Sequence, residues 1–367
     1  MDFTFSEEQR MMATAVRELL DDVCTPAQLR VAAGPAEVGE GTAAGGDDPA
    51  RWARLVELGL PGMLAPEAVG GMGLTDIDFV LVAEETGRAA LPEPLVEHAG
   101  IAVPLLAALA GQGSGSRVGD WLQRAASGEA RVAITHPLNA TVLGAATAEA
   151  FVLFHHDEVH LVEREAVTLL RQPSVDRLRA LATVDWQPDT ATCIADGTTG
   201  AVLRKLAFAR GAVASAAQLL GLADRMVRIA VDYASTRQQF GKVIGSYQAL
   251  KHQLADVAVQ LEYAKPVVYA AAARLAEVTA NGLPELSPLR ALTAHVSGAK
   301  LMAGEAAELA SRRAMQAHGA MGYSWEVDLH FYMKRAWALG GSWGDRAWHQ
   351  RRLETAVLEG AGVGSLL

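Results

Sequence analysis

The sequence predicts a mostly α-helical fold with a small β region in the middle. Apolar residues recur at helical spacing near the start, short β-rich segments follow, and long alanine- and leucine-rich stretches fill the remainder. A chain of 367 residues exceeds one simple core, so two or three structural units are expected. We place an N-terminal helical domain at 1–128, a β domain at 129–200 and a C-terminal four-helix bundle at 201–367.

The first predicted helix begins after Ser6, which can cap it together with Gln9 three residues further on. The stretches 34–50 and 111–116 are rich in glycine and small or polar residues, and are expected to be loops. Further helices are expected at 51–58, 76–89 and 96–110.

The middle of the chain contains short β-rich segments separated by polar breaks, which predicts a small sheet or barrel. The expected strands are 131–135, 150–154, 158–163, 181–184 and 191–195. Three long helices are then expected at 203–235, 247–279 and 286–316, and two shorter ones at 326–339 and 344–357. Long antiparallel helices with short links are typical of a four-helix bundle.

Composition excludes several classes of function. The net charge of −10, with scattered basic residues, argues against a nucleic-acid partner. Cys24 and Cys193 are the only cysteines, so neither a disulfide framework nor a metal site is expected. The sequence also lacks a secretory signal pattern and a window of about 18 uninterrupted apolar residues. We therefore expect a cytoplasmic protein without a membrane span.

The connector Tyr233–Gln248 separates two long predicted helices. It holds a cation (Arg237), an aromatic ring (Phe240) and a side-chain amide (Gln248), as well as two glycines. A guanidinium offers a fork of donors to a phosphate group, and a ring offers a flat apolar surface. The connector therefore suits a ligand that carries both a phosphate and a flat ring. Without further context, Arg237 and Phe240 could equally cap one helix and staple the next.

Three segments resemble the acyl-CoA dehydrogenase family, and the resemblance covers nearly the whole chain. They are the connector with its continuation to Asp256, the glycine-rich segment 58–74, and the segment Gln316-Ala-His-Gly-Ala-Met-Gly-Tyr. The resemblance implies the acyl-CoA dehydrogenase fold and FAD as cofactor. It also implies oxidation of acyl-CoA thioesters, in which a carboxylate base removes the α-proton and a hydride passes to the flavin. An electron-transfer flavoprotein is the implied acceptor.

The resemblance also implies which residues hold FAD, usually an FAD bound mainly to a neighbouring subunit. The implied contacts are Arg237, Gln239, Phe240, Tyr247 and Gln248 from the connector, and Gln316, Gly319 and Ala320 from the later segment. Gln316 and Gly319 could also form an ordinary helix C-cap and turn.

The sequence departs from the family at the base. Trp343 stands where the most frequent catalytic carboxylate is expected, and Gly211 stands at the less frequent position. A tryptophan cannot abstract a proton, because that step needs a group of suitable pKa. Asp345 is the nearest carboxylate, although an N-cap role for it is the better interpretation. The chain therefore has no expected catalytic residue, with Asp345 as the remaining candidate.

A second departure lies in the shortened β domain. Thr135 remains, but His136 replaces the acid that follows it in the family, and the Ser/Gly/Asp loop that touches flavin and substrate is missing. What is retained lies on the nucleotide side of FAD. This pattern resembles the base-less subunit of actinobacterial heterotetrameric acyl-CoA dehydrogenases of steroid side-chain degradation. It implies an α2β2 complex with a homologous subunit that carries the catalytic glutamate.

Three hypotheses follow. The first is the FAD-completing subunit of such a complex, acting on a bulky acyl-CoA, for which a sterol-derived ester is one candidate. The second is a self-sufficient acyl-CoA dehydrogenase with a relocated base. The third is a non-catalytic scaffold subunit that does not bind FAD.

Overall fold

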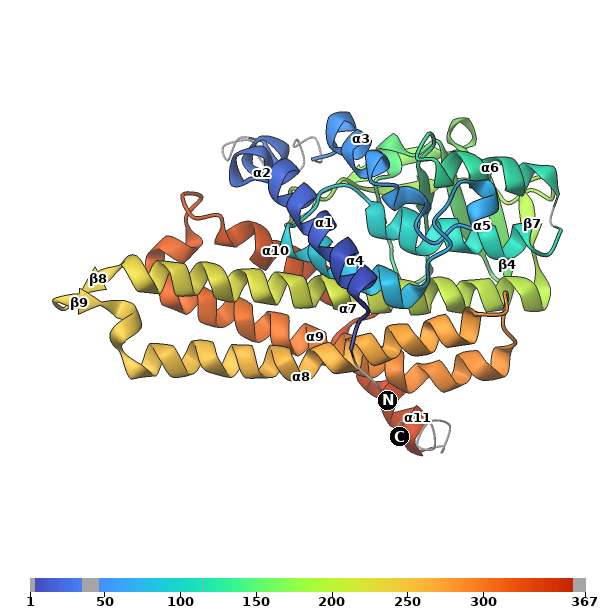
Figure 1. Ribbon diagram of the computed structural model, residues 1–367. Coiled ribbons are helices and arrows are strands. Elements are labelled where there is room, and N and C mark those ends of the chain that lie inside the picture. Colours follow the sequence, from blue (N-terminus) through green and yellow to red (C-terminus); the bar gives the residue numbers. More distant parts are fainter. Residues whose placement is uncertain (1–3, 35–45, 114, 359–367) are drawn as a thin grey trace.

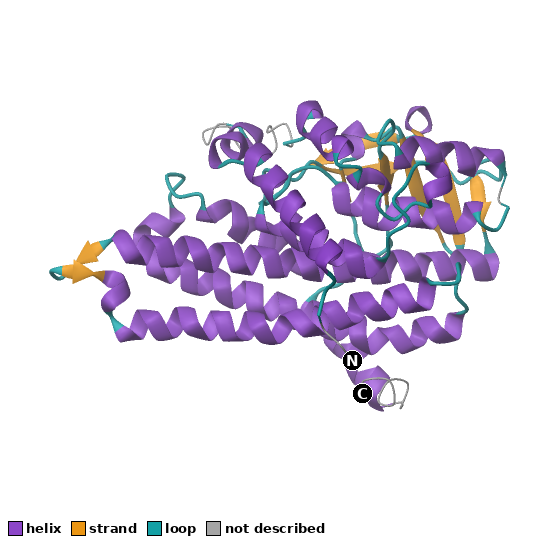
Figure 2. Ribbon diagram, viewed as in Figure 1, coloured by secondary structure: helices purple, strands orange, loops and turns teal. Residues whose placement is uncertain are grey.

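The computed structural model describes residues 4–34, 46–113 and 115–358. Long helices run side by side through the molecule, and the N-terminal helices and the β region cover one face of them (Figures 1 and 2). The predicted loop at 34–50 lies largely outside the described residues, as does part of the predicted loop at 111–116.

The N-terminal part is helical, as predicted. Ser6 caps the first helix: its Oγ accepts from the Gln9 backbone N–H at 3.2 Å, and Gln9 Oε1 accepts from the Ser6 N–H at 2.9 Å. The predicted helix at 96–110 consists of a π-helix over Val96–Ala102 and an α-helix over Val103–Ala110. Pro104, which has no N–H to donate, lies just after the junction of these two helices. The helices are α1 (Glu7–Val23), α2 (Pro26–Ala33), α3 (Pro49–Glu57), α4 (Asp76–Arg88), the π-helix Val96–Ala102, α5 (Val103–Ala110) and α6 (Ser116–Ala126).

Two of these helices were not predicted. Helix α2 begins with a capping box in which Thr25 and Gln28 bond to one another's backbone, and this Thr-Pro-x-Gln pattern was readable in the sequence. Helix α6 is amphipathic and buries Trp121, Leu122 and Ala125. The loop expected at 111–116 ends where this helix begins, and no element was predicted for the residues that follow.

The β region forms two small sheets, so the barrel alternative was wrong for the described residues. One sheet has the order β1-β3-β4-β7 and the other β2-β6-β5. Strand β1 pairs with β3 in parallel, and the remaining pairs of these two sheets are antiparallel. The strands are β1 (Val132–Ile134), β2 (Val142–Leu143), β3 (Ala150–His155), β4 (Glu158–Glu163), β5 (Thr168–Gln172), β6 (Leu181–Asp185) and β7 (Cys193–Ala195). Strands β2 and β5 were not predicted.

Three long helices form the C-terminal bundle, and two shorter helices together take the fourth position by packing on α9. Helix α7 begins six residues before the predicted start at Leu203. A two-stranded hairpin joins α7 and α8 at one end of the molecule (Figure 1). The elements are α7 (Gly197–Thr236), β8 (Gln238–Gln239), β9 (Lys242–Val243), α8 (Gln248–Thr279), α9 (Leu286–His318), α10 (Leu329–Gly341) and α11 (Arg346–Leu358).

Helices α4 and α7 cross at two glycines. A Cβ at Gly87 would lie 2.1 Å from the Gln218 carbonyl oxygen, and one at Gly221 would lie 1.9 Å from that of Glu84. Only glycine allows this approach of the two backbones. The crossing joins the N-terminal helices to the bundle in one continuous core.

Among the described helices, α7 alone is long and apolar enough to cross a membrane, but the apolar window that meets this criterion is completely buried inside the protein. A core helix meets the same criterion, so this is weak evidence for a span.

Candidate functional site

The connector forms an arm that projects beyond the end of the bundle (Figure 1). Its tip is a tight turn in which Phe240 and Gly241 have φ of +52° and +77°, as a two-residue hairpin turn requires. Arg237 ends α7 by donating its backbone N–H to the Tyr233 carbonyl oxygen at 2.9 Å. The cap uses only the backbone, so the Arg237 side chain is left exposed.

The side chains of the arm point outward. Phe240 is 91% exposed, so it does not staple α8. Gln239 and Gln248 are exposed as well. Tyr247 is half-buried, and its hydroxyl donates to the Gln239 carbonyl oxygen at 3.3 Å. Within this chain the arm has a ring, a cation and two amides that are turned towards solvent.

The second predicted segment lies beside the base of the arm. The rings of Tyr233, in the last turn of α7, and His318, the last residue of α9, stack with centroids 4.3 Å apart. His318 lies between the predicted contacts Gln316 and Gly319, and burial lowers its pKa. Sequence reasoning missed this stacked pair, which holds the two segments together.

Gly319 ends α9 with a φ of +59°. Its N–H donates to the carbonyl oxygen of Gln316, so the segment does form a helix C-cap. The side chain of Gln316 and the residue Ala320 remain exposed at this corner. The segment therefore forms a C-cap and, at the same corner, leaves Gln316 and Ala320 accessible to a ligand.

Trp343 and Gly211, the two positions at which a catalytic carboxylate was expected, contact each other. Trp343 is 3% exposed, and its indole lies so close to Gly211 that a Cβ there would be 2.2 Å from Cδ2 of the ring. Trp343 has a φ of +57°, an uncommon conformation for a bulky residue. Two hydrogen bonds hold it: its N–H donates to Asn139 Oδ1 at 2.9 Å, and its carbonyl oxygen accepts from His349 Nε2 at 2.9 Å.

Further rings enclose the indole. The ring of His136 lies 5.4 Å from that of Trp343 and 5.7 Å from that of Phe208. Burial, together with the charge of the nearby Arg204, lowers the pKa of His136 to about 4. His136 is therefore a neutral, packed ring at neutral pH, and aromatic side chains surround the indole of Trp343.

Asp345 lies at the start of α11. Its Oδ1 accepts from the Trp348 backbone N–H at 2.7 Å, which is the geometry of an N-cap. The residue is exposed and does not line the cavity at Trp343.

Lys300 is a buried charge that sequence reasoning missed. Its Nζ donates to the carbonyl oxygens of Leu339, Gly340 and Gly344 at 2.9–3.2 Å. Burial lowers its pKa to about 7. The amine thus ties the end of α10 and the loop that carries Trp343 to α9.

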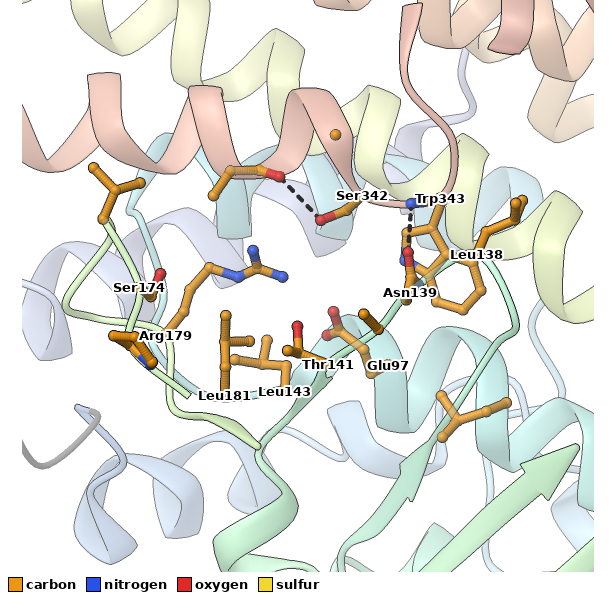
Figure 3. Close-up of a pocket in the computed structure, with 16 residues that line it drawn as sticks. Glu97, Leu138, Asn139, Thr141, Leu143, Ser174, Arg179, Leu181, Ser342 and Trp343 are labelled. Atoms are coloured by element: carbon orange, nitrogen blue, oxygen red, sulfur yellow. Dashed lines mark hydrogen bonds between the residues drawn. The ribbon is translucent and has the colours of Figure 1, made fainter. Parts of the chain in front are cut away.

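Two cavities meet at Leu138. The first, of about 340 Å³, is bounded by Trp343 and contains Glu97 and Arg179 (Figure 3). The second, of about 640 Å³, is lined in part by the rings of Phe208 and Trp348. No acidic residue lines this second cavity in the described part of the chain, and its cations are Arg204, Lys205, Arg290, Arg351 and Arg352. Such a surface suits a phosphorylated ligand.

The fold and these motifs define a flavoprotein dehydrogenase architecture. Residues 6–129 match the N-terminal domain of acyl-CoA dehydrogenases and residues 198–350 match their C-terminal domain. The chain belongs to the acyl-CoA dehydrogenase family. Members of this family are oxidoreductases that bind FAD.

Individual relatives and structures agree with this assignment. The chain is 29% identical to acyl-CoA dehydrogenase IpdE2 of Mycobacterium tuberculosis, over 90% of this chain and 91% of that protein. The ChsE4–ChsE5 complex of the same organism contains a chain with a TM-score of 0.78 and 22% identity. The match covers 98% of this chain and 99% of that chain. A variant of the Tcur3481–Tcur3483 steroid acyl-CoA dehydrogenase contains a chain with a TM-score of 0.79 and 23% identity. The match covers 97% of this chain and 99% of that chain. The similarity to these two structures establishes the fold.

Proposed function

We propose that this chain completes the FAD site of an α2β2 acyl-CoA dehydrogenase whose homologous partner subunit carries the catalytic glutamate. The complex oxidises an acyl-CoA thioester to the α,β-enoyl-CoA, and a sterol side-chain ester is the proposed substrate. An electron-transfer flavoprotein is the proposed acceptor, and the cytoplasm the proposed location. Bound FAD supplies the hydride acceptor for this reaction.

One contrast within the chain carries the proposal. Arg237, Phe240 and Gln248 are exposed on the arm and free to reach a ligand outside this chain. Trp343 and Gly211, at the two base positions, are packed against each other. A chain with an open nucleotide arm and a closed base position is suited to assist a flavin held elsewhere.

The arm has the groups that the nucleotide end of FAD requires. The Arg237 guanidinium can donate two parallel hydrogen bonds to the pyrophosphate, and the ring of Phe240 can pack on the adenine. Gln316 and Gly319, next to the stacked Tyr233–His318 pair, offer an amide and an open backbone at the same corner. The similarity to chains of two-component complexes further supports a partner subunit.

The experiment is co-expression with a homologous dehydrogenase subunit that carries the glutamate, followed by flavin absorbance and mass measurement. We expect a yellow α2β2 complex, and little flavin on this chain when it is purified alone. A stable homotetramer of this chain with full FAD content and activity would contradict the proposal.

A self-sufficient enzyme is the second candidate. The cavity with five cations favours it, because that surface could hold the phosphates of an acyl-CoA. Turnover by the purified single chain, abolished by Asp345→Asn, would support it. A colourless purified chain, together with a complex whose flavin content is unaffected by Arg237→Ala, would support the scaffold hypothesis instead.

A further inference from the structure

The 340 Å³ cavity contains two ionisable side chains to which the proposed function assigns no role. Glu97 enters from the π-helix and Arg179 from the loop between β5 and β6, and both point into the cavity (Figure 3). Trp343, with its N–H bonded to Asn139, closes one side. The volume is at the lower end of the range for ligand pockets, about 300–1,000 Å³.

The neighbouring charges are already paired. Arg335 and Asp176 form a buried ion pair, and Arg335 Nη1 also donates to the Leu91 carbonyl oxygen at 2.8 Å. Arg179 forms no ion pair with any described residue, and its Nε is buried without a hydrogen-bond partner. Among the described residues, Arg179 is therefore the cation of this cluster that has no carboxylate at ion-pair distance, although Glu97 and Asp176 act on it from further away.

Glu97 does not neutralise Arg179 by direct contact. Burial raises the pKa of the Glu97 carboxyl, while the charges of Arg179 and Arg335 act to lower it. Burial and the repulsion of Arg335 lower the pKa of Arg179. A guanidinium still keeps its proton at neutral pH. The cavity thus holds the guanidinium of a half-buried arginine, whose buried Nε has no hydrogen-bond partner, beside a half-buried carboxyl that is biased towards its neutral form. A buried polar group without a partner is costly.

The rest of the lining fits the body of a small organic acid. Thr141, Ser174 and Ser342 contribute hydroxyl groups, and Asn139 contributes a side-chain amide. Apolar contact comes from the side chains of Ile134, Leu143, Leu181 and Trp343.

We propose that this cavity binds a small organic carboxylate, whose carboxylate group pairs with Arg179 and whose hydroxyl or carbonyl oxygen contacts Glu97 and Thr141. The anion would supply the negatively charged partner that Arg179 lacks among the described residues. This goes beyond the proposed function, which assigns no ligand pocket to the interior of this chain.

Calorimetry on the complex and on the full-length chain tests the proposal, with 3-hydroxybutyrate as the probe and its uncharged amide as the comparison. We expect the acid to bind at least about tenfold more tightly than the amide, since a charge-assisted pair contributes roughly 1.5–3 kcal/mol. Arg179→Met should abolish that preference, and Arg179→Lys should keep part of it. Arg171→Met is the matched control, because Arg171 is exposed on β5 and does not line the cavity. Absence of 3-hydroxybutyrate binding, or equal affinity for acid and amide, would overturn the proposal.

A second variant covers the case in which Arg179→Met does not fold. In the wild type, binding should weaken as pH rises, because Glu97 loses its proton opposite the ligand. The facing charges, Arg179 and Arg335, stay constant over that range. Glu97→Gln should bind with little pH dependence, and an unchanged pH profile in this variant would refute the assignment. The flavin content of the complex should be the same in all these variants, so the outcome is independent of the proposed function.

Discussion

The indole of Trp343 packs on the backbone of Gly211, at a distance that leaves no room for a Cβ. Residue 343 follows α10 and residue 211 lies in the first half of α7. The contact therefore joins the two positions at which a catalytic carboxylate was expected, and residue 211 cannot carry a side chain while Trp343 keeps its present place. The closed base position is a packed feature of the core.

Gly211→Ala should destabilise the fold. The added methyl meets a rigid, buried ring, so we expect a loss of about 1–3 kcal/mol from overpacking. Thermal or urea unfolding measures it. Gly304→Ala is the control, because Gly304 lies in α9 with open space around its Cα and should be neutral or slightly stabilising. Equal stability of the two variants would show that the ring can move away.

Arg237→Ala should lower the flavin content of the complex. We expect FAD to bind about ten- to a hundredfold more weakly, since the variant loses charged hydrogen bonds to phosphate. Flavin absorbance after dialysis measures the effect. Arg228→Ala is the control, because Arg228 is an exposed arginine on α7 that pairs with Asp224 in its own helix. A complex that stays fully yellow in Arg237→Ala would count against the arm as an FAD contact.

Asp345→Asn should leave both stability and turnover of the complex unchanged. Asparagine caps a helix as well as aspartate does, whereas Asp345→Ala should cost about 0.5–2 kcal/mol through loss of the bond to Trp348. Unfolding curves and steady-state assays of the two variants test this. A large drop in turnover in Asp345→Asn, without loss of stability, would instead favour a relocated base.

Acidification should loosen the contact at Trp343 through His349. Burial lowers the pKa of His349 to about 4, against roughly 6.5 in an unfolded chain. The unfolded state therefore binds more protons between these values. The stability from neutral His349 is complete above about pH 6.5 and is lost as pH falls towards 4, by on the order of 1–3 kcal/mol.

His349→Gln tests this dependence, because it removes the titrating group from the bond to the Trp343 carbonyl. Unfolding free energies at pH 7 and pH 4.5 should differ less in this variant than in the wild type. His252→Gln, which changes an exposed histidine of α8, should behave like the wild type. A variant as acid-sensitive as the wild type would show that His349 does not titrate in this way.

Much of the fold could be read from the sequence, because long amphipathic periodicities and caps act locally. The cap formed by Ser6 and Gln9 is one example. Helices α8 and α9 are others, because their observed bounds agree with the predicted bounds within two residues. The short strands β2 and β5 were missed, because their pairing with β6 depends on long-range register. The domain limits at 128 and 200 and the FAD contacts on the arm and at Gln316, Gly319 and Ala320 stay predictions.

The sequence by itself determined the family, the connector between two long helices that carries Arg237 and Phe240, and the absence of an acid at residues 211 and 343, since these depend only on residue identity and order. Only the tertiary structure decided that Trp343 fills the space above Gly211, that Tyr233 stacks on His318, and that Arg179 and Glu97 share one cavity. These relationships join residues far apart in the chain. Burial and the pairing of neighbouring charges set their chemistry, and both properties arise only when the chain is folded.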